Sequence, residues 1–368
     1  MIEQTTNHIN QHTYVAIMAG GIGSRFWPVS RTNYPKQFLD ILGTGRTLIQ
    51  QTFARFSRFV PKENIYVVTS NEYVELVKEQ LTDIPVENII GEPFRKNTAP
   101  CIAYISTKLL QKDPEASLIV APSDHLILEE QKFLEVCTNA LSFVNHFNAL
   151  VTIGIKPTYP NTGYGYIQHE PLEAAPAVYK VKTFTEKPNK ELAQTFIDSG
   201  DFLWNAGIFV WQVKQIMDAF HKHLPEMYEL FAGEADKFNT EAESEIINMI
   251  YPQCTNISID FGIMEKARNV YVIPASFGWS DLGTWNSAWE NMEKDYLGNA
   301  VAGKKVMVID ATRCVVHTSN DKLVILQGLD DFIVVDTKDA LLICQKEKEQ
   351  EIKDYVAEVK RNIGDQYL

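Results

Sequence analysis

Long apolar runs are missing from this chain of 368 residues. None approaches the roughly 18 consecutive apolar residues that a membrane-spanning helix needs, so we expect no membrane partner. The first twelve residues are polar and contain no apolar signal-peptide core. We therefore expect residues 1–12 to form a disordered tail.

Cysteine is also scarce. The five cysteines are scattered, are odd in number and include no Cys-x-x-Cys pair. This pattern is typical of reduced core residues and predicts a cytoplasmic protein. The formal charge of −13 disfavours nucleic acid as a partner, but it leaves an anionic small substrate possible, because steering depends on the local field.

Acidic residues are absent between Tyr14 and Leu39, against the acidic background of the whole chain. The segment opens with an apolar run, 14–18, that predicts a buried strand. Glycines then let the backbone turn tightly and expose its N–H groups, and three cations follow. Oriented amides and positive charges in one place are what a polyphosphate needs. We predict a nucleotide site built from Gly20, Gly21, Gly23, Ser24, Arg25 and Lys36.

Two well-known nucleotide-binding patterns do not fit this loop. A dinucleotide fingerprint would have a third glycine where Phe26 stands, and Trp27-Pro28 interrupts any helix starting there. These features exclude a dehydrogenase. A P-loop would need Gly-Lys-Ser/Thr, and the similar spacing near Gly303-Lys304 has Lys305 in place of the Ser/Thr.

The motif continues with Trp27-Pro28, Ser30-Arg31 and 35–39 (Pro-Lys-Gln-Phe-Leu). Together with Gly-Gly-x-Gly-x-Arg it resembles the sugar-1-phosphate nucleotidyltransferases. The Trp-Pro and Lys-Gln-Phe-Leu portions are closer to the guanylyltransferase branch that acts on mannose 1-phosphate. The resemblance covers residues 14–285. Phe26 replaces the Leu more usual in that family, which implies only a change in packing.

Strand-like and helix-like patterns alternate from Tyr14 to Ile155, which predicts an α/β fold with a mostly parallel mixed sheet. Further on we expect a strand over 178–186 and a helix over 190–199. We assign residues 13–295 to a Rossmann-like nucleotidyltransferase catalytic domain. After Asn299, short β runs recur about every nine residues and predict a small C-terminal β module over 296–368, closed by a helix over 346–362. The resemblance implies a left-handed β-helix for this module.

The reaction implied by the resemblance is attack of a sugar-1-phosphate oxygen on the α-phosphorus of GTP. Because both reactants are anions, catalysis consists of aligning them and neutralising charge. By resemblance, Arg25 grips the triphosphate and Lys36 lies near the α-phosphate, while the amides of the glycine loop line the nucleotide. For Arg31, structural pairing and substrate contact remain alternatives.

Two aspartates are candidate ligands of Mg²⁺. Asp124 follows a predicted buried strand, and Asp281 lies in a loop rich in glycine and aromatic residues. Two carboxylates about 4 Å apart would repel by about 4 kcal/mol at an effective dielectric of 20, and a divalent cation would remove that cost. Taken alone, either residue fits a turn or a helix cap better. In the family the matching pair holds the metal.

Sugar recognition is expected in the middle of the chain. Residues 184–188 resemble the family's Phe-x-Glu-Lys-Pro segment, in which Glu186 would accept hydrogen bonds from hydroxyls and Lys187 would meet the sugar phosphate. Asn205 matches a second sugar-contacting segment. Gly165 would let the backbone approach the hexose, although a β-hairpin explains it equally well.

The base and ribose are expected near Glu92, Asn97 and Thr98. Asn97 or Thr98 followed by Pro100 is also a good helix start, so a capping role alone would suffice. Asp260, in another segment that matches the guanylyltransferase branch, has no definite role.

The resemblance of these residues to the family implies an enzyme that transfers GMP from GTP to mannose 1-phosphate, with Mg²⁺ as cofactor. One alternative is a same-class enzyme using another base or hexose 1-phosphate. The other is a non-catalytic nucleotide-sugar sensor, which the presence of Lys36, Asp124 and Asp281 disfavours. An exposed β module would suit a homodimer.

Overall fold

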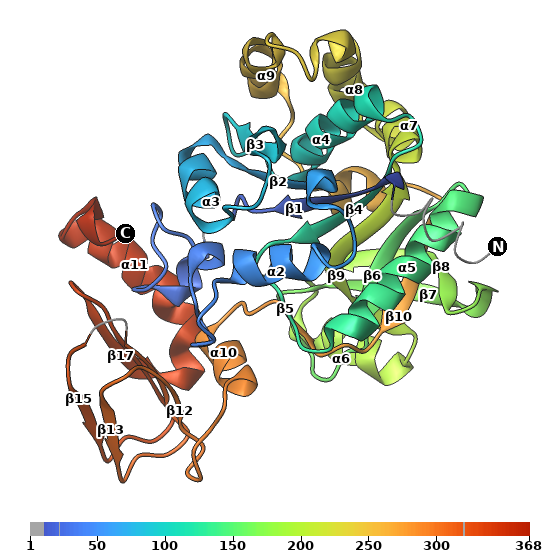
Figure 1. Ribbon diagram of the computed structural model, residues 1–368. Helices are drawn as coiled ribbons and strands as arrows, with labels where there is room; N and C mark the ends of the chain where they lie inside the picture. Colours follow the sequence, from blue (N-terminus) through green and yellow to red (C-terminus); the bar gives the residue numbers. More distant parts are fainter. Residues whose placement is uncertain (1–10, 22, 319–320) are drawn as a thin grey trace. The chain divides into compact units, whose positions relative to one another are not determined.

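A computed structural model describes residues 11–21, 23–318 and 321–368 of the chain (Figure 1). The predicted tail, residues 1–12, lies almost entirely outside the described residues. The chain divides into unit 1 (1–20, 53–122 and 127–279) and unit 2 (21–52, 123–126 and 280–368). This division is discontinuous along the chain, whereas the domains proposed from sequence, 13–295 and 296–368, are contiguous. Those boundaries stay predictions.

In the described part of unit 1, nine strands form one sheet in the order β3-β2-β1-β4-β9-β6-β10-β8-β7. The strands are β1 (Thr13–Met18), β2 (Ile65–Ser70), β3 (Ile89–Glu92), β4 (Ser117–Pro122), β6 (Leu150–Ile155), β7 (Gly165–Ala175), β8 (Val178–Glu186), β9 (Phe202–Gln212) and β10 (Val270–Ala275). β1 pairs in parallel with β2 on one side and with β4 on the other. The glycine loop thus begins where β1 ends, at a switch point of the strand order, where ligands bind in such sheets.

The sheet is mixed, which confirms the predicted α/β class. Parallel pairing joins β3, β2, β1 and β4, and also β6 with β10. β9 runs antiparallel to both β4 and β6, and β7 and β8 form a long antiparallel pair. The parallel part corresponds to the segment with alternating strand and helix patterns, since parallel strands need crossover connections.

Helices cover both faces of this sheet. Figure 1 shows α4 and α7 on one side and α5 on the other. Val15, Ala16 and Ile17 of β1 are fully buried as a result, as a strand covered on both faces should be. The α-helices that lie wholly within the described residues of this unit are α3 (Val74–Gln80), α4 (Thr98–Lys112), α5 (Glu130–His146), α6 (Lys190–Ser199), α7 (Val213–His223), α8 (Pro225–Ala232) and α9 (Glu243–Ile250).

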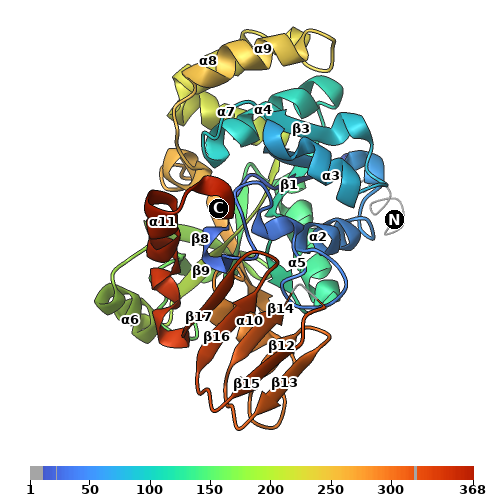
Figure 2. The same ribbon diagram turned by 90° about the vertical axis from the view of Figure 1, so that its left-hand side faces the viewer.

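Unit 2 contains the C-terminal β module, whose short strands are seen face-on in Figure 2. The strands are β12 (Ala300–Ala302), β13 (Val306–Ile309), β14 (Val315–Thr318), β15 (Val324–Gln327), β16 (Phe332–Asp336) and β17 (Leu341–Gln345). β12, β14 and β16 pair in parallel, as do β13 and β15, and the antiparallel β17 closes the larger sheet. Val316, Val334 and Leu326 fill the core of this module.

Helices α10 (Trp285–Asn291) and α11 (Ile352–Asn362) complete unit 2. The predicted final helix is confirmed from Ile352 onward, but Lys346–Glu351 form a 3₁₀ turn instead. Three elements span the points where the chain passes from one unit to the other: α2 (Leu48–Phe56), β5 (Leu126–Ile127) and β11 (Trp279–Ser280). Among the described residues, no helix is long and apolar enough to cross a membrane.

Candidate functional site

The ammonium group of Lys36 is the centre of a candidate site in unit 2. Lys36 starts the 3₁₀ turn Lys36–Phe38 and is only 5% exposed. Its Nζ lies 2.8 Å from Asp124 Oδ2 and donates hydrogen bonds to the main-chain oxygens of Asp281 (2.8 Å) and Leu282 (3.1 Å). Each N–H of the ammonium therefore has an oxygen acceptor, which offsets much of the cost of burying the charge.

The glycine loop packs against this lysine. Gly23 has φ +65°, and a Cβ placed on it would lie 2.4 Å from Lys36 Cβ. The main-chain oxygen of Gly21 accepts a hydrogen bond of 3.0 Å from Gln37 Nε2. A Cβ on Gly21 itself would meet nothing within 4 Å. Gly23 is thus the position of the loop at which both backbone conformation and space require glycine.

Asp124 is held as a carboxylate by its surroundings. Burial alone would raise the pKa of Asp124, but the charges of Lys36 and His125 and the hydrogen bond from Lys36 lower that pKa below its usual value. Asp281 lies in a tight turn, where Oδ1 accepts a hydrogen bond of 3.0 Å from the N–H of Gly283. A Cβ on Gly283 would come within 2.6 Å of Asp281 Oδ2, so the glycine leaves room for this carboxylate.

The two candidate carboxylates, Asp124 and Asp281, are of a type that suits a magnesium ion. In the described part of the chain, His, Cys, Asp and Glu side chains form no group of three or more that could hold a metal ion. Mg²⁺ does not need such a group, because it usually binds one or two carboxylates and completes its shell with water and substrate phosphates. The carboxylates of Asp124 and Asp281 are hard oxygen ligands of that kind.

The remaining cations of the loop differ in their surroundings. Arg25 is exposed, and its charge opposes the rise in pKa that burial causes at Glu349. The side chain of Ser24 lies outside the described residues. Arg31 donates to the main-chain oxygen of Pro28 at 2.7 Å and forms an ion pair with Asp339 at 2.7 Å. These contacts favour the structural alternative for Arg31.

The predicted sugar-binding residues come together in unit 1. Gly165 of β7 lies opposite Glu186 of β8, and a Cβ on Gly165 would lie 2.4 Å from Glu186 Oε2. The same Cβ would lie 3.4 Å from Asn205 Cβ. Gly165 therefore provides the space in which Glu186 and Asn205 face each other. Lys187 is exposed, with its Nζ 3.4 Å from Glu186 Oε1.

Asn205 is also bound to Asp260, at the start of the π-helical turn Asp260–Met264. Its Nδ2 donates a hydrogen bond of 2.8 Å to Asp260 Oδ1. Burial, and then the charge of Glu186, raise the pKa of Asp260 to about 6, which the hydrogen bond from Asn205 partly opposes. Thus Asp260, whose role the sequence left open, belongs to the same group of side chains as Glu186 and Asn205.

Glu92, at the end of β3, is buried beside Gly20. A Cβ on Gly20 would lie 3.5 Å from Glu92 Oε2, and the hydroxyl of Tyr251 donates a short hydrogen bond to Glu92 Oε1. Burial raises the pKa of Glu92 to about 7 in spite of hydrogen bonds from Tyr251 and Cys101. Tyr251 is not expected from sequence, because 159 residues separate it from Glu92.

Asn97 and Thr98 form the start of α4, as the capping alternative predicts. Asn97 has φ 68°, and its side-chain oxygen accepts a hydrogen bond of 3.0 Å from the N–H of Thr98. Thr98 Oγ1 accepts one of 2.9 Å from the N–H of Ile259. The described contacts of both residues therefore stabilise the helix start, which leaves their role toward a nucleotide a prediction.

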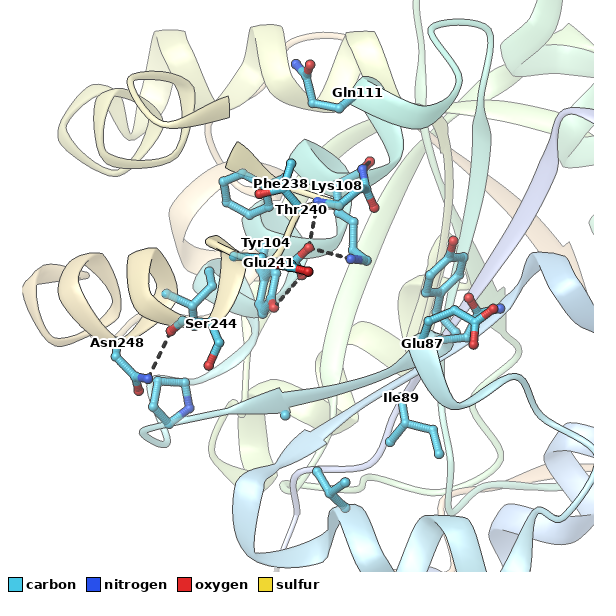
Figure 3. A pocket seen from close by; sticks show the side chains of 18 of the residues that line it. Glu87, Ile89, Tyr104, Lys108, Gln111, Phe238, Thr240, Glu241, Ser244 and Asn248 are labelled. Carbon is cyan, nitrogen blue, oxygen red and sulfur yellow. Dashed lines mark hydrogen bonds and ion pairs between the residues drawn. The ribbon is translucent and has the colours of Figure 1, made fainter. Parts of the chain in front are cut away.

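A separate pocket of about 900 Å³ lies in unit 1, between the edge strand β3, helix α4 and residues 238–248 (Figure 3). Two polar side chains of the pocket contact the carboxylate of Glu243. Lys108 Nζ lies 2.6 Å from Glu243 Oε2, and Tyr104 donates a hydrogen bond of 2.8 Å to Glu243 Oε1. These groups satisfy one another. Gly91 and Pro93, which flank Glu92 in the segment expected to meet the base and ribose, line this pocket, but Glu92, Asn97 and Thr98 do not.

Comparison with known proteins agrees with this arrangement of fold and side chains. Residues 14–296 match the nucleotidyl transferase family, and residues 304–359 match the MannoseP isomerase/GMP-like beta-helix domain. The chain belongs to the nucleotidyl transferase family, and it is an enzyme of that class. Its β module, predicted from spacing and resemblance, is confirmed as β-helix-like, and the handedness stays a prediction.

Individual proteins of the nucleotidyl transferase family are similar to this chain over most of its length. It is 37% identical to the mannose-1-phosphate guanylyltransferase of Salmonella montevideo, over 94% of this chain and 73% of that protein. It is also 37% identical to the alginate biosynthesis protein AlgA of Pseudomonas syringae pv. tomato, over 93% of this chain and 70% of that protein. A crystal structure from Thermus thermophilus, named a mannose-1-phosphate geranyltransferase, has a TM-score of 0.85 at 30% identity and covers 95% of this chain and 99% of its own.

Proposed function

We propose that this chain transfers GMP from GTP to mannose 1-phosphate, giving GDP-mannose and pyrophosphate. An oxygen of the sugar phosphate attacks the α-phosphorus of GTP, forming a new P–O bond. The bond from the α-phosphorus to the bridging oxygen breaks, and its electron pair leaves with pyrophosphate. The observation that carries this proposal is the buried Lys36 ammonium, held by Asp124 and the Asp281–Leu282 backbone beside the glycine loop.

Charge neutralisation is the main task of the unit 2 residues in this reaction. Lys36 stabilises negative charge on the α-phosphate, Arg25 binds the triphosphate, and the amides from Gly20 to Ser24 line the nucleotide. Such positive charges and amides act strongly because they are fixed in place before charge develops on the phosphate. Asp124 and Asp281 would hold Mg²⁺, which when bound supplies positive charge to the phosphate oxygens.

Recognition of the two substrates falls to unit 1 residues. Glu186 accepts hydrogen bonds from sugar hydroxyls, Asn205 contacts the same sugar, and Lys187 meets its phosphate. Gly165 keeps the space beside Glu186 open for the hexose. Glu92, Asn97 and Thr98 bind the base and ribose. The support for these roles is the family resemblance together with the grouping of Gly165, Glu186 and Asn205.

Pyrophosphate release tests the reaction. Protein, Mg²⁺ and mannose 1-phosphate are incubated with GTP, UTP, ATP or CTP, and Asp281→Ala is assayed in parallel. Release with GTP, lost in the variant, supports the reaction, the base and the metal site. Release with another nucleotide favours a same-class enzyme of different specificity. A folded protein that binds GDP-mannose but releases no pyrophosphate would be a nucleotide-sugar sensor.

We also propose that the protein acts in the cytoplasm and forms a homodimer through its β module. The five cysteines are free and buried, which suits a reducing compartment. The outer face of β13 and β15 exposes Met307, Ile309 and Ile325, a set of apolar side chains that a second copy could cover. Light scattering of wild type and Ile325→Lys tests this, because a dimer through this face should become a monomer.

A further inference from the structure

The carboxamide of Asn205 has most of its hydrogen-bonding capacity satisfied inside the protein. Its Oδ1 accepts from Thr152 Oγ1 and from the N–H of Gly207, each at 3.1 Å. Its Nδ2 donates to Asp260 Oδ1 at 2.8 Å. An amide oxygen has two acceptor sites and an amide nitrogen carries two hydrogens. Among the described residues, the N–H of Gly207 fills one acceptor site. The single hydroxyl hydrogen of Thr152, which also lies within reach of the main-chain oxygen of Ile208 (3.3 Å), is directed to the other, and one N–H of the amide is left.

The elements around Asn205 bring these partners together. In the pairing of β6 with β9, Asn205 lies opposite Gly154. The register shifts between Thr152 and Gly154, so Thr152 also lies near Asn205. Gly207 has φ +67°, a conformation that favours glycine and that turns its N–H toward the Asn205 oxygen. Asp260 reaches the nitrogen side of the same amide from the π-helical turn.

A charged carboxylate at position 260 carries a free-energy cost. Burial and the neighbouring Glu186 both disfavour the charged form of Asp260, which is why the pKa of this residue is raised. A neutral side chain could fill the space without that cost. What the carboxylate adds is a strong acceptor that binds the nitrogen, but not the oxygen, of Asn205.

We propose that Asp260 is a positioning residue that fixes the Asn205 carboxamide so that it offers the sugar only an N–H donor. This inference rests on the proposed function, in which Asn205 and Glu186 bind the hexose. The neighbouring Glu186 carboxylate is an acceptor, so the pair presents one donor and one acceptor side by side. A bound polyol would then have to accept at one hydroxyl and donate at the next.

Steady-state kinetics of Asp260→Ala, Asn205→Ala and the double variant test this role. Asp260→Ala should raise KM for mannose 1-phosphate about tenfold, which corresponds to about 1.4 kcal/mol, and leave KM for GTP within twofold of wild type. In the Asn205→Ala background the same change should have little further effect. Asp260→Asn, which can still offer an oxygen to Nδ2, should recover most of the lost affinity.

Glu265→Ala is the matched control. Glu265 belongs to the same segment and its pKa is also raised, by burial and by Glu186, but the side chain is exposed. If the charge alone mattered, this variant would change KM for the sugar phosphate as Asp260→Ala does. We expect KM to stay at the wild-type value.

Two results would overturn the inference: equal effects of Asp260→Ala in the wild-type and Asn205→Ala backgrounds, or a change in KM for GTP as large as that for the sugar. If Asp260→Ala does not fold, judged by thermal unfolding, Asp260→Leu, which fills the space but offers no acceptor to Asn205, carries the test in both backgrounds. Wild-type turnover separates the two proposals. A wild type without turnover removes the proposed function and this inference with it, whereas an active wild type with additive variants removes this inference alone.

Discussion

A β-carbon on Gly23 would lie 2.4 Å from the β-carbon of Lys36. The glycine loop therefore touches the stem of the lysine whose ammonium is bound to Asp124 and to the 281–282 backbone. Any side chain at position 23 must displace either the loop or the lysine.

Gly23→Ala should consequently lower both stability and turnover. The φ of +65° costs an alanine roughly 1–2 kcal/mol, and relief of the overlap with Lys36 adds to that cost. Urea unfolding should show a loss of about 2 kcal/mol or more. Gly21→Ala, where a Cβ meets nothing within 4 Å, is the control for stability. Equal free energies of unfolding for the two variants would contradict this explanation.

Lys36→Met should lower kcat by about 10²–10³-fold, the usual cost of losing one preorganised group that stabilises a developing negative charge. The methionine keeps most of the buried volume but removes the ammonium that neutralises Asp124, so circular dichroism and thermal unfolding must first show that the variant is folded. Arg31→Met removes another cation of the same segment, one that is bound to Asp339 and Pro28. Its turnover should stay near that of wild type. A drop of less than tenfold in Lys36→Met would remove the lysine from the reaction.

The metal requirement can be tested by removal. Chelation with EDTA should stop pyrophosphate release, and added Mg²⁺ should restore it. Asp281→Asn should shift the Mg²⁺ concentration for half-maximal activity upward by about tenfold or more, because a neutral amide is a weaker ligand than a carboxylate. Full activity in excess EDTA would show that Asp124 and Asp281 do not serve this purpose.

Glu92 should make stability depend on pH. Burial raises the pKa of Glu92 from 4.5 to about 7, so the folded protein binds this proton more tightly than the unfolded chain. The resulting stabilisation is complete below pH 4.5 and is lost as the pH rises through about 7. Relative to Glu92→Gln, wild type should lose roughly 3 kcal/mol between pH 4.5 and pH 8 in urea unfolding. A difference that does not vary with pH would mean that Glu92 titrates normally.

Local patterns were sufficient for much of this fold. Strand β8 (Val178–Glu186) and helix α6 (Lys190–Ser199) have the bounds predicted from sequence. Helix α5 (Glu130–His146) was not predicted, although Phe133, Cys137, Leu141 and Val144 recur at helical spacing and are buried. This periodicity is the same signal that predicts helix α6.

Local sequence patterns do not predict contacts between side chains that are far apart in the chain. The motifs identify Lys36, Glu92 and Asn205 as candidates, but the partners Leu282, Tyr251 and Asp260 follow only from how the chain folds back. Those partners determine whether a group is charged and which atom it presents. Arg31 illustrates the same point, because its structural role depends on Asp339, 308 residues away.

Lys36 leaves the ribosome well before the atoms that will hold it. Its main-chain acceptor in Asp281 is 245 residues further along the chain. At translation rates of 5–20 residues per second, the lysine waits roughly 10–50 seconds for that partner. The phosphate-binding chemistry proposed here therefore cannot assemble on a nascent chain until Asp281 has been made.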